Sequence, residues 1–348
     1  MGLLSLQYYA NAQDGGRQIF SWLNSPVSPR LAAVGGENMS IYDQDVNLAY
    51  HNPATLNSAA LGTLAINYQF YYAGLKQGYV DYAFKPKKQS ALLMHTGLKF
   101  MNYGEFQHAD EFGQINGTFA AAEYIFTAGG SIPINTRWSF GANMKFILSN
   151  LESYQATGLG LDLGVHYRFK DSLSWFGLGV RNLGGQLSTY YRGGPTDPLP
   201  VRLAATFSTR LRYVPLRLFI TAYQLEQWTL RYDDDAEPQT DIFGIPIPEP
   251  SATSKFVDNF FRHLIFGIEI PLGKPERLTL RLGYNHFRKK ELEVEAYRSF
   301  AGFSGGVGLN FGRLRLDYGF GTYHLAGSTH HLGLRVPLTS FFKKQIDL

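Results

Sequence analysis

The stretch WSFGANMKFILS, residues 138–149, alternates apolar and polar positions along its length. One face carries the apolar side chains of Trp138, Phe140, Ala142, Met144, Phe146 and Leu148. The opposite face carries small or polar residues, namely Ser139, Gly141, Asn143, Lys145 and Ser149. Successive side chains of a β-strand point to opposite sides of the sheet, so a period of two predicts a strand with one apolar and one polar face.

The same alternation recurs along most of the chain and predicts fourteen strands. We expect these strands at residues 61–73, 76–86, 89–103, 117–132, 136–149, 156–169, 173–186, 199–213, 215–231, 260–272, 275–288, 301–312, 313–323 and 328–338. Most of these segments exceed the roughly five or six residues of soluble strands, and they match the roughly 9–11 residues that cross a bilayer at a tilt. An even number of such strands is typical of an outer-membrane barrel.

The lengths of the connections support the same fold. Links after even-numbered strands are short, whereas the longer links all follow odd-numbered strands, at residues 104–116, 187–198, 232–259 and 289–300. Barrels have short periplasmic turns and longer external loops, so periplasmic chain ends place every long link outside the cell. The sequence therefore predicts a 14-stranded antiparallel transmembrane β-barrel. A soluble barrel with an apolar interior would show the same alternation.

Composition narrows the classes of function. The chain has 348 residues, of which 37 are glycine, 15% are aromatic and 17% are charged, and its formal net charge is +4. This small net charge gives no reason to expect nucleic-acid binding. The sequence contains no apolar run of about 18 residues, which excludes membrane-spanning helices. The absence of cysteine excludes disulfides, thiolate metal sites and cysteine nucleophiles.

The beginning of the chain differs from the alternating body. Residues 1–12, MGLLSLQYYANA, join a short apolar core to the small-residue pattern Ala10-Asn11-Ala12, which is typical of the end of a secretory signal peptide. Residues 13–60 lack the alternation, so we expect them to pack on or inside the barrel. The predicted domains are a signal-peptide remnant at 1–12, an N-terminal hatch at 13–60, the barrel at 61–338 and a periplasmic tail at 339–348.

One block of this N-terminal segment resembles a known family. Residues 15–56 read GGRQIFSWLNSPVSPRLAAVGGENMSIYDQDVNLAYHNPATL. This block is similar to the N-terminal block of the PorV/PorQ family of the type IX secretion system of Bacteroidota, a group of FadL-like outer-membrane β-barrels. Asp43 and Asp45 match positions of the block, and Asn52-Pro53-Ala54 resembles the NPA motif in the hatch of FadL-like barrels.

The resemblance implies an integral outer-membrane protein with an N-terminal hatch. It also implies a role in docking a PorZ-like surface protein, which works with the attachment complex that contains PorU and PorV. Outer-membrane lipids and lipopolysaccharide are further expected partners, and nucleic acid is not. We expect no enzymatic activity and no catalytic, cofactor-binding or metal-binding residues.

The hatch residues have a physical role that the sequence itself suggests. Asparagine bonds to nearby backbone groups and proline fixes φ, so Asn52-Pro53 predicts a rigid turn. Because buried charges need partners, we expect Asp43 and Asp45 to pair with arginines on the lumen face of the strands. The candidate arginines are Arg202, Arg210, Arg281, Arg315 and Arg335. The sequence thus predicts a lumen filled by the hatch and by ion pairs.

The longest link, residues 232–259, is the candidate docking loop. It contains the acidic run Asp233, Asp234 and Asp235, followed by the extended segment around Pro246 and Pro248. Clustered carboxylates can bind calcium, but the spacing of an EF-hand loop is absent, so a solvated, protruding loop is the preferred interpretation.

Two other functions remain open. FadL-like barrels also include transporters of hydrophobic small molecules, which would need a continuous apolar track through the lumen. An outer-membrane hydrolase would need a compact polar triad at the rim of the barrel, yet the sequence contains no G-x-S-x-G motif.

Overall fold

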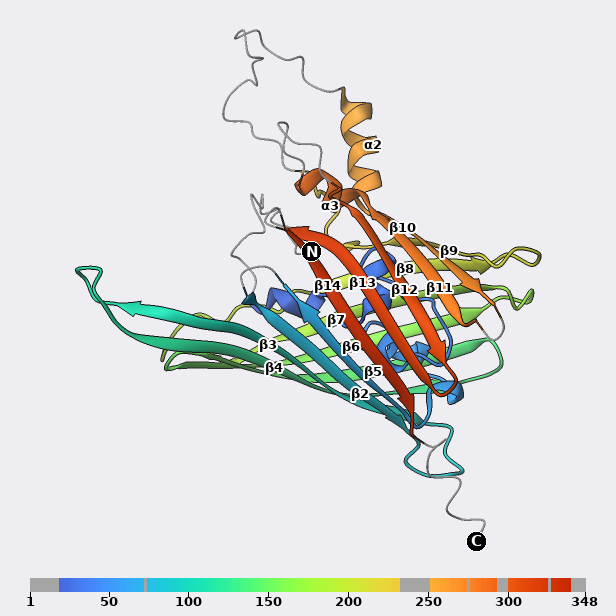
Figure 1. Ribbon diagram of the computed structural model, residues 1–348, viewed down its shortest axis with the longest axis horizontal. Helices are drawn as coiled ribbons and strands as arrows, with labels where there is room; N and C mark the ends of the chain where they lie inside the picture. Colours follow the sequence, from blue (N-terminus) through green and yellow to red (C-terminus); the bar gives the residue numbers. More distant parts are fainter. Residues whose placement is uncertain are drawn as a thin grey trace, which may run out of the picture.

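The structure is a computed structural model, and it describes residues 19–71, 74–231, 251–273, 276–292, 300–324 and 327–338. In that part of the chain, fourteen antiparallel strands form a closed barrel (Figure 1). Each strand pairs with its neighbours in sequence, and β1 closes the barrel against β14. This confirms the predicted fold class. None of the described helices is long and apolar enough to cross a membrane.

The strand bounds follow the alternating segments of the sequence. The strands are β1 (Thr63–Phe70), β2 (Lys76–Phe84), β3 (Leu93–Ala109), β4 (Ile115–Pro133), β5 (Trp138–Leu151), β6 (Tyr154–Arg168), β7 (Ser174–Ser188), β8 (Arg202–Arg210), β9 (Arg217–Ala222), β10 (Leu264–Leu272), β11 (Leu278–Asn285), β12 (Phe303–Phe311), β13 (Leu314–His324) and β14 (Gly327–Pro337).

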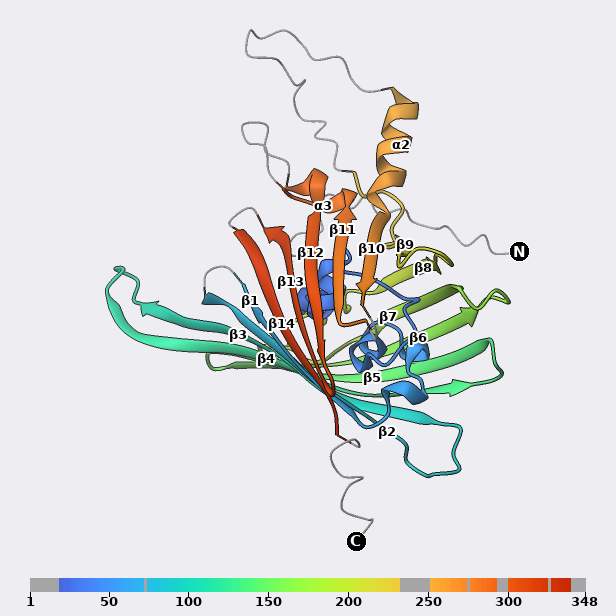
Figure 2. The same ribbon diagram turned by 45° about the vertical axis from the view of Figure 1, so that its right-hand side comes forward.

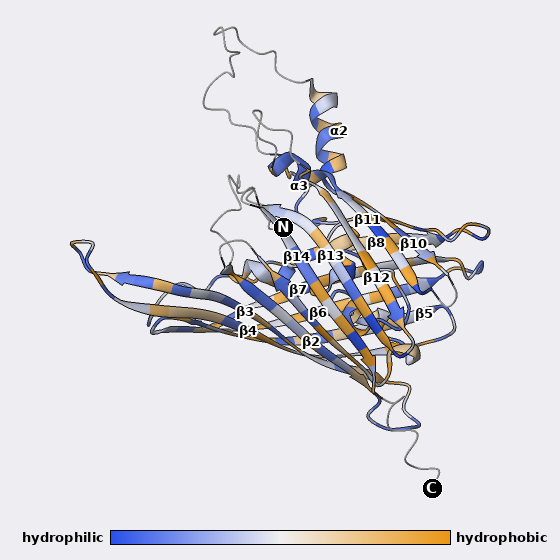
Figure 3. Cartoon of the chain, in the orientation of Figure 1, coloured by the Kyte–Doolittle hydropathy of each residue, from blue (hydrophilic) through white to orange (hydrophobic). Residues whose placement is uncertain are grey.

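The strand β5 shows how the alternation becomes a barrel wall. Its Asn143 and Lys145 are fully buried toward the lumen, whereas Phe140, Met144 and Phe146 face outwards and are 46%, 58% and 41% exposed. Hydrophobic and hydrophilic residues alternate in the same way along other strands (Figure 3). The apolar face therefore lies outside, as a surrounding lipid bilayer requires, and a soluble barrel with an apolar interior does not fit.

The two ends of the barrel differ. Thr63, at the start of β1, pairs with Pro337, at the end of β14, so the chain enters and leaves the barrel at the same end. We call this the short-turn end, because links such as Gly312-Arg313 join neighbouring strands there. The opposite, long-loop end carries the helices α2 (Ala252–Arg262) and α3 (His286–Glu291), which stand above β10 and β11 (Figure 2).

At the long-loop end, the predicted loop over residues 104–116 is wrong. There, β3 and β4 continue as a two-stranded hairpin that extends away from the barrel (Figure 1). Phe106 and Phe119 stack across this hairpin with ring centroids 5.3 Å apart, and such cross-strand aromatic pairs stabilise strand pairing. The period-two pattern weakens in this segment, so the sequence alone did not reveal the continued strands.

The predicted strand over residues 215–231 is too long. β9 ends at Ala222, because Gln224 adopts a φ of 55°, which is incompatible with an extended strand. The helix α2 also lies partly within the predicted loop 232–259. The side chain of Ser251 accepts a hydrogen bond from the backbone of Ser254 and caps the first turn of this helix.

The described residues before β1 lie inside the barrel, and we call residues 19–60 the hatch (Figure 2). The hatch contains one short α-helix and four 3-10 helices: η1 (Ser21–Asn24), α1 (Pro29–Ala33), η2 (Val46–Tyr50), η3 (Pro53–Thr55) and η4 (Ser58–Ala60). Four of these helices begin with a side chain that accepts a backbone hydrogen bond, from Ser28, Asp45, Asn52 and Asn57. The predicted signal-peptide remnant and the predicted tail 339–348 lie outside the described residues.

Candidate functional site

The hatch packs against the inner wall on all sides. Leu31, Leu48 and Tyr50 of the hatch form a buried cluster with Tyr79 of β2 and Phe219 of β9. Because these wall residues lie on widely separated strands, the hatch connects opposite parts of the barrel. We therefore take the hatch and the wall residues that contact it as the candidate functional site.

Asn52-Pro53-Ala54 forms a tight turn against the wall. The side-chain oxygen of Asn52 accepts a hydrogen bond from the backbone of Ala54 at 3.0 Å. Its amide nitrogen donates to the carbonyl oxygens of Met39, at 2.7 Å, and of Val165 on β6, at 3.2 Å. One side chain thus fixes the turn, the neighbouring hatch segment and the wall.

Glycine makes room for this turn. A Cβ atom at Gly141 of β5 would lie 2.5 Å from the backbone of Pro53 and Ala54, and a Cβ atom at Gly164 of β6 would collide with the side chain of Asn52. Gly177 of β7 is likewise in contact with the backbone of Met39. Adjacent strands therefore present a glycine surface to the hatch, which accounts for part of the glycine excess in the sequence.

Asp43 and Asp45 both pair with arginine. Asp43 lies 2.8 Å from Arg30 and 3.4 Å from Arg217, while Asp45 lies 3.4 Å from Arg30 and 3.4 Å from Arg335. Arg335 is one of the arginines that the sequence suggested as partners. Arg30, in the hatch itself, and Arg217, at the start of β9, are partners that sequence reasoning missed.

Arg30 also connects the hatch to the strand β10 of the wall. Its guanidinium group donates to both carboxylate oxygens of Glu269 on β10, at 2.6 and 2.9 Å, in a buried two-pronged pair. Glu269 lies 2.9 Å from Arg281 on β11, which in turn lies 2.7 Å from Asp317 on β13. Arg30, Asp43 and Asp45 of the hatch thus belong to one network with charged residues of the wall.

The remaining suggested arginines pair elsewhere. Arg202 lies 2.7 Å from Glu226, and Arg210 lies 3.4 Å from Glu276, both outside the hatch. Arg281 and Arg315 both pair with Asp317 instead. Pairing with Asp43 or Asp45 is therefore wrong for all four of these arginines. Alternation indicates which face of a strand a side chain lies on. It does not indicate how far along the barrel axis that side chain lies, because the strands are tilted, and so it does not show whether the side chain reaches the hatch.

A second ion pair joins the hatch to β7, and sequence reasoning missed it too. Arg181 lies 2.5 Å from Glu37, and the same carboxylate lies 2.8 Å from the ring of His51. Burial by itself raises the pKa of the Glu37 carboxyl, but Arg181 and His51 outweigh burial and lower the pKa to about 2. The only hint in the sequence is that Glu37 and His51 are ionisable residues in a segment that is otherwise poor in charge.

The wall contains an acid–histidine pair, but its geometry does not match a hydrolase. His95 of β3 lies 3.1 Å from Asp81 of β2, and its other ring nitrogen lies 2.9 Å from the side-chain oxygen of Asn143. A serine hydrolase would need a hydroxyl nucleophile at that second nitrogen. Both His95 and Asp81 are fully buried. This pair therefore lacks the nucleophile of a hydrolase triad.

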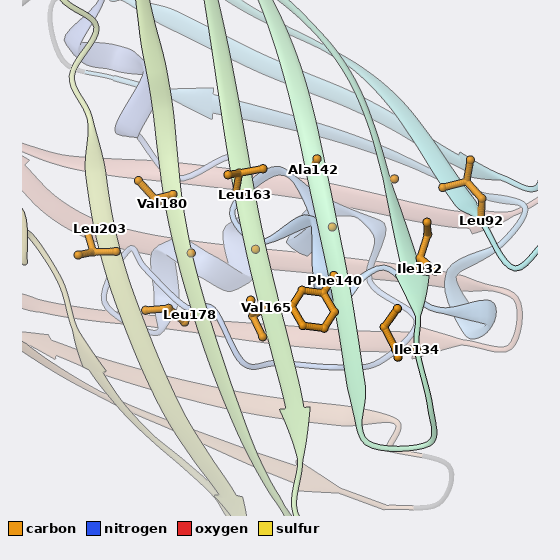
Figure 4. Close-up of a pocket in the computed structure, with 14 residues that line it drawn as sticks. Leu92, Ile132, Ile134, Phe140, Ala142, Leu163, Val165, Leu178, Val180 and Leu203 are labelled. Carbon is orange, nitrogen blue, oxygen red and sulfur yellow. The ribbon is translucent and has the colours of Figure 1, made fainter.

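A large apolar hollow lies on the outer face of the barrel. It has a volume of about 650 Å³ and is lined by apolar side chains such as Phe140, Leu163 and Leu178. These side chains lie on neighbouring strands, with helices of the hatch behind them (Figure 4). The small residues Gly130 and Ala142 leave the space open. Because the hollow faces outwards, it is not part of a track through the lumen.

The predicted docking residues Asp233, Asp234, Asp235, Pro246 and Pro248 lie outside the described residues. The segment that follows them is the helix α2, whose Phe256 and Phe260 are 58% and 44% exposed. The structure thus describes a helix with exposed phenylalanine side chains, whose first part lies within the predicted docking loop 232–259. No group of three or more histidine, aspartate or glutamate residues suited to a metal ion occurs among the described residues.

Comparison with known proteins adds information on the fold. No protein-family model matches the chain, and no curated protein matches it. The structure resembles the toluene transporter TodX of Pseudomonas putida at a TM-score of 0.51 and 13% identity, covering 89% of this chain and 96% of that chain. A TodX monoaromatic hydrocarbon channel deltaS2 mutant matches at a TM-score of 0.50 and 14% identity, covering 88% and 96%. A FadL homologue of Pseudomonas aeruginosa matches at a TM-score of 0.49 and 10% identity, covering 90% and 98%. The likeness to TodX shows a common fold.

Proposed function

We propose that the chain is an integral outer-membrane β-barrel without enzymatic activity, which docks a surface partner of the type IX secretion machinery. The observation that carries this proposal is the hatch, which occupies the lumen and contacts its wall. Ion pairs bind the hatch to the wall, and the backbone of the hatch packs against the glycine surface. A barrel filled in this way suits a membrane anchor for a partner better than an open pore. The partner would be a PorZ-like surface protein that works with PorU and PorV.

The sequence of the hatch supports this assignment. The block at residues 15–56 resembles the PorV/PorQ family, and its extended GGRQIFSWLN opening favours a PorQ-like member. In the structure, Asp43, Asp45 and Asn52 of this block all contact the wall or the charged network. The apolar outer face would contact membrane lipids and lipopolysaccharide.

The docking proposal is tested by affinity purification of the full chain from native membranes, with identification of the co-purified proteins. Deleting residues 232–250 should abolish recovery of a large surface partner, while the barrel stays folded and heat-modifiable. The matched control replaces residues 106–118, the tip of the β3–β4 hairpin at the same end, with a short turn. Unchanged recovery after the loop deletion, or loss only with the hairpin variant, would reject the loop assignment.

Transport of hydrophobic small molecules is the second candidate function. The likeness to the fold of a toluene transporter favours it. Because TodX is a toluene transporter, this likeness favours transport more than it favours docking. The polar and charged surroundings of the hatch speak against a continuous apolar track, and the apolar hollow of about 650 Å³ faces outwards.

Uptake of labelled toluene separates the two candidates. Cells that carry the chain in the outer membrane should take up toluene no faster than cells without it if the chain is a dock. Faster uptake, combined with no co-purified partner, would favour the transporter.

A further inference from the structure

Three guanidinium groups meet at one carboxylate near the short-turn end of the lumen. Asp317 of β13 lies 2.7 Å from Arg281, 3.1 Å from Arg335 and 3.3 Å from Arg315. These arginines lie on β11, β14 and β13, so their side chains converge on Asp317 from three strands of one side of the barrel, with β12 between β11 and β13. A single carboxylate offers two oxygens and one negative charge, which is less than three guanidinium groups can use.

The surrounding ion-pair network also carries an excess of positive charge. It contains five arginines and four carboxylates, which leaves one net positive charge. The members are Arg30, Arg217, Arg281, Arg315 and Arg335, with Asp43, Asp45, Glu269 and Asp317. Two nitrogens in this network, Nη2 of Arg281 and Nε of Arg335, are buried and have no hydrogen-bond partner among the described residues. Buried donors without partners are rare and costly.

A polar cavity lies beside these groups. It has a volume of about 370 Å³, and its lining includes Arg30, Arg210, Arg217, Arg315 and Arg335. A neighbouring hollow of about 100 Å³ shares Arg315 and Arg335 and reaches Gly312, in the turn between β12 and β13. The site therefore lies at the short-turn end, far from the docking elements at the long-loop end.

The carboxylates at the cavity do not cancel this excess. Asp43 and Glu269 each contact two or more arginines, and Glu276 pairs with Arg210 at the rim. Arg315 is less engaged: its carboxylate contact is a 3.3 Å approach to an aspartate that Arg281 and Arg335 share. Arg315 and Arg335 thus lie where an additional anion would meet positive charge.

We propose that this cavity binds a phosphoryl anion. A phosphoryl group offers three or more acceptor oxygens and up to two negative charges, and guanidinium forks match such groups closely. A phosphoryl group would balance the net positive charge and accept hydrogen bonds from several arginines at once. A second carboxylate has fewer oxygens and would engage fewer of them. The source is either a soluble phosphate or phosphoester, or the headgroup of a phospholipid in the adjacent leaflet. This inference is independent of the docking function.

The test is a calorimetric titration of the purified full chain, in detergent, with inorganic phosphate at constant ionic strength. Saturable binding is expected, and Arg315→Gln should weaken it about tenfold or more, because hydrogen bonds to charged groups are among the strongest in proteins. Arg210→Gln, at the exposed rim, should weaken binding to a lesser degree and keeps the proposal testable if Arg315→Gln fails to fold. Arg137→Gln, in another short turn, is the matched control and should bind as the wild type does.

The source of the phosphoryl group is found with nanodiscs of mixed phosphatidylglycerol and phosphatidylcholine, followed by native mass spectrometry. Selective retention of phosphatidylglycerol that is lost in Arg315→Gln would assign the site to a lipid headgroup. Phosphate binding without lipid retention would assign it to a soluble anion. The proposal would be overturned if the wild type bound no phosphate and retained no lipid. It would also be overturned if Arg315→Gln and Arg137→Gln had equal effects.

Discussion

The ammonium group of Lys99, on β3, lies 2.8 Å from the carbonyl oxygen of Trp22 in the hatch. The same nitrogen donates to the carbonyl and hydroxyl oxygens of Ser25, at 3.1 and 2.9 Å. It also lies 5.0 Å from the centre of the Trp22 ring and 5.1 Å from that of Tyr50. A fully buried lysine thus satisfies the carbonyl groups at the end of the 3-10 helix η1. This contact holds the hatch to the wall at a point remote from the arginine network.

Replacing Lys99 should therefore loosen the hatch. Lys99→Met keeps most of the side-chain volume but removes the donor to the Ser25 carbonyl and one of three donors to the Trp22 carbonyl, which we expect to cost about 1–3 kcal/mol. Hydrogen exchange of η1 should rise while exchange of the strands far from the hatch stays low. The control is Lys88→Met, an exposed lysine between β2 and β3. Equal exchange in the two variants would show that Lys99 does not hold the hatch.

Adding one methyl group to the glycine surface should displace the Asn52-Pro53-Ala54 turn. Gly141→Ala places a Cβ atom 2.5 Å from the backbone of Pro53 and Ala54, where no flexible side chain can yield. Overpacking of this kind costs about 1–3 kcal/mol, measurable as a lower urea midpoint in detergent. Gly117→Ala is the control, because nothing lies within 4 Å of its Cβ position. If Gly141→Ala and Gly117→Ala unfolded at the same urea concentration, the tight packing of the turn would be contradicted.

The pair of Arg30 and Glu269 should contribute strongly to stability. Arg30→Gln leaves a buried carboxylate at Glu269 with fewer partners, and breaking such a pair costs about 3–5 kcal/mol. Glu269→Gln should have a similar effect, and the double variant should lose less than the sum of the two single losses. Arg210→Gln removes an exposed pair and should change stability by about 1 kcal/mol at most. Additive losses in the double-mutant cycle would show that the two groups do not interact.

The stability of the hatch should depend on pH through Glu37, which lies outside the strands that cross the membrane. Its pKa falls from the ordinary value of 4.5 to about 2 in the folded protein. A lowered pKa contributes stability above pH 4.5, and this contribution is lost as the pH falls toward 2. The difference in thermal stability between the wild type and Glu37→Gln should therefore be largest above pH 4.5 and shrink on acidification. A difference that is constant over this range would refute the assigned role of Glu37.

The closed lumen should prevent large, unselective ion conductance in planar bilayers. Deleting the hatch, residues 19–60, should open the barrel and raise the conductance, provided that the variant remains heat-modifiable. Large conductance of the intact chain would contradict a lumen filled by the hatch.

Much of the fold could be predicted from the sequence, because the alternation of side chains along a strand is a local property. The pattern at residues 138–149 separated the apolar face from the polar face, and its repetition identified the number of strands, but which face points into the lumen was decided by the structure. It failed for residues 104–116 and for the end of β9, where a hairpin extension and the left-handed Gln224 depart from the local pattern. The candidate site was harder to predict from the sequence, since ion pairs inside the barrel join residues that are distant in sequence.

The sequence by itself determined the alternating strands, their number and the turn at Asn52-Pro53, since strand alternation and proline geometry depend only on near neighbours. Only the tertiary structure decided that Arg30 pairs with Glu269, that Lys99 meets Trp22 and that Asp317 is shared by three arginines. These contacts depend on strand tilt, on register around the closed barrel and on the path of the hatch through it. Each of them is set by the packing of the whole chain, and none by a local pattern.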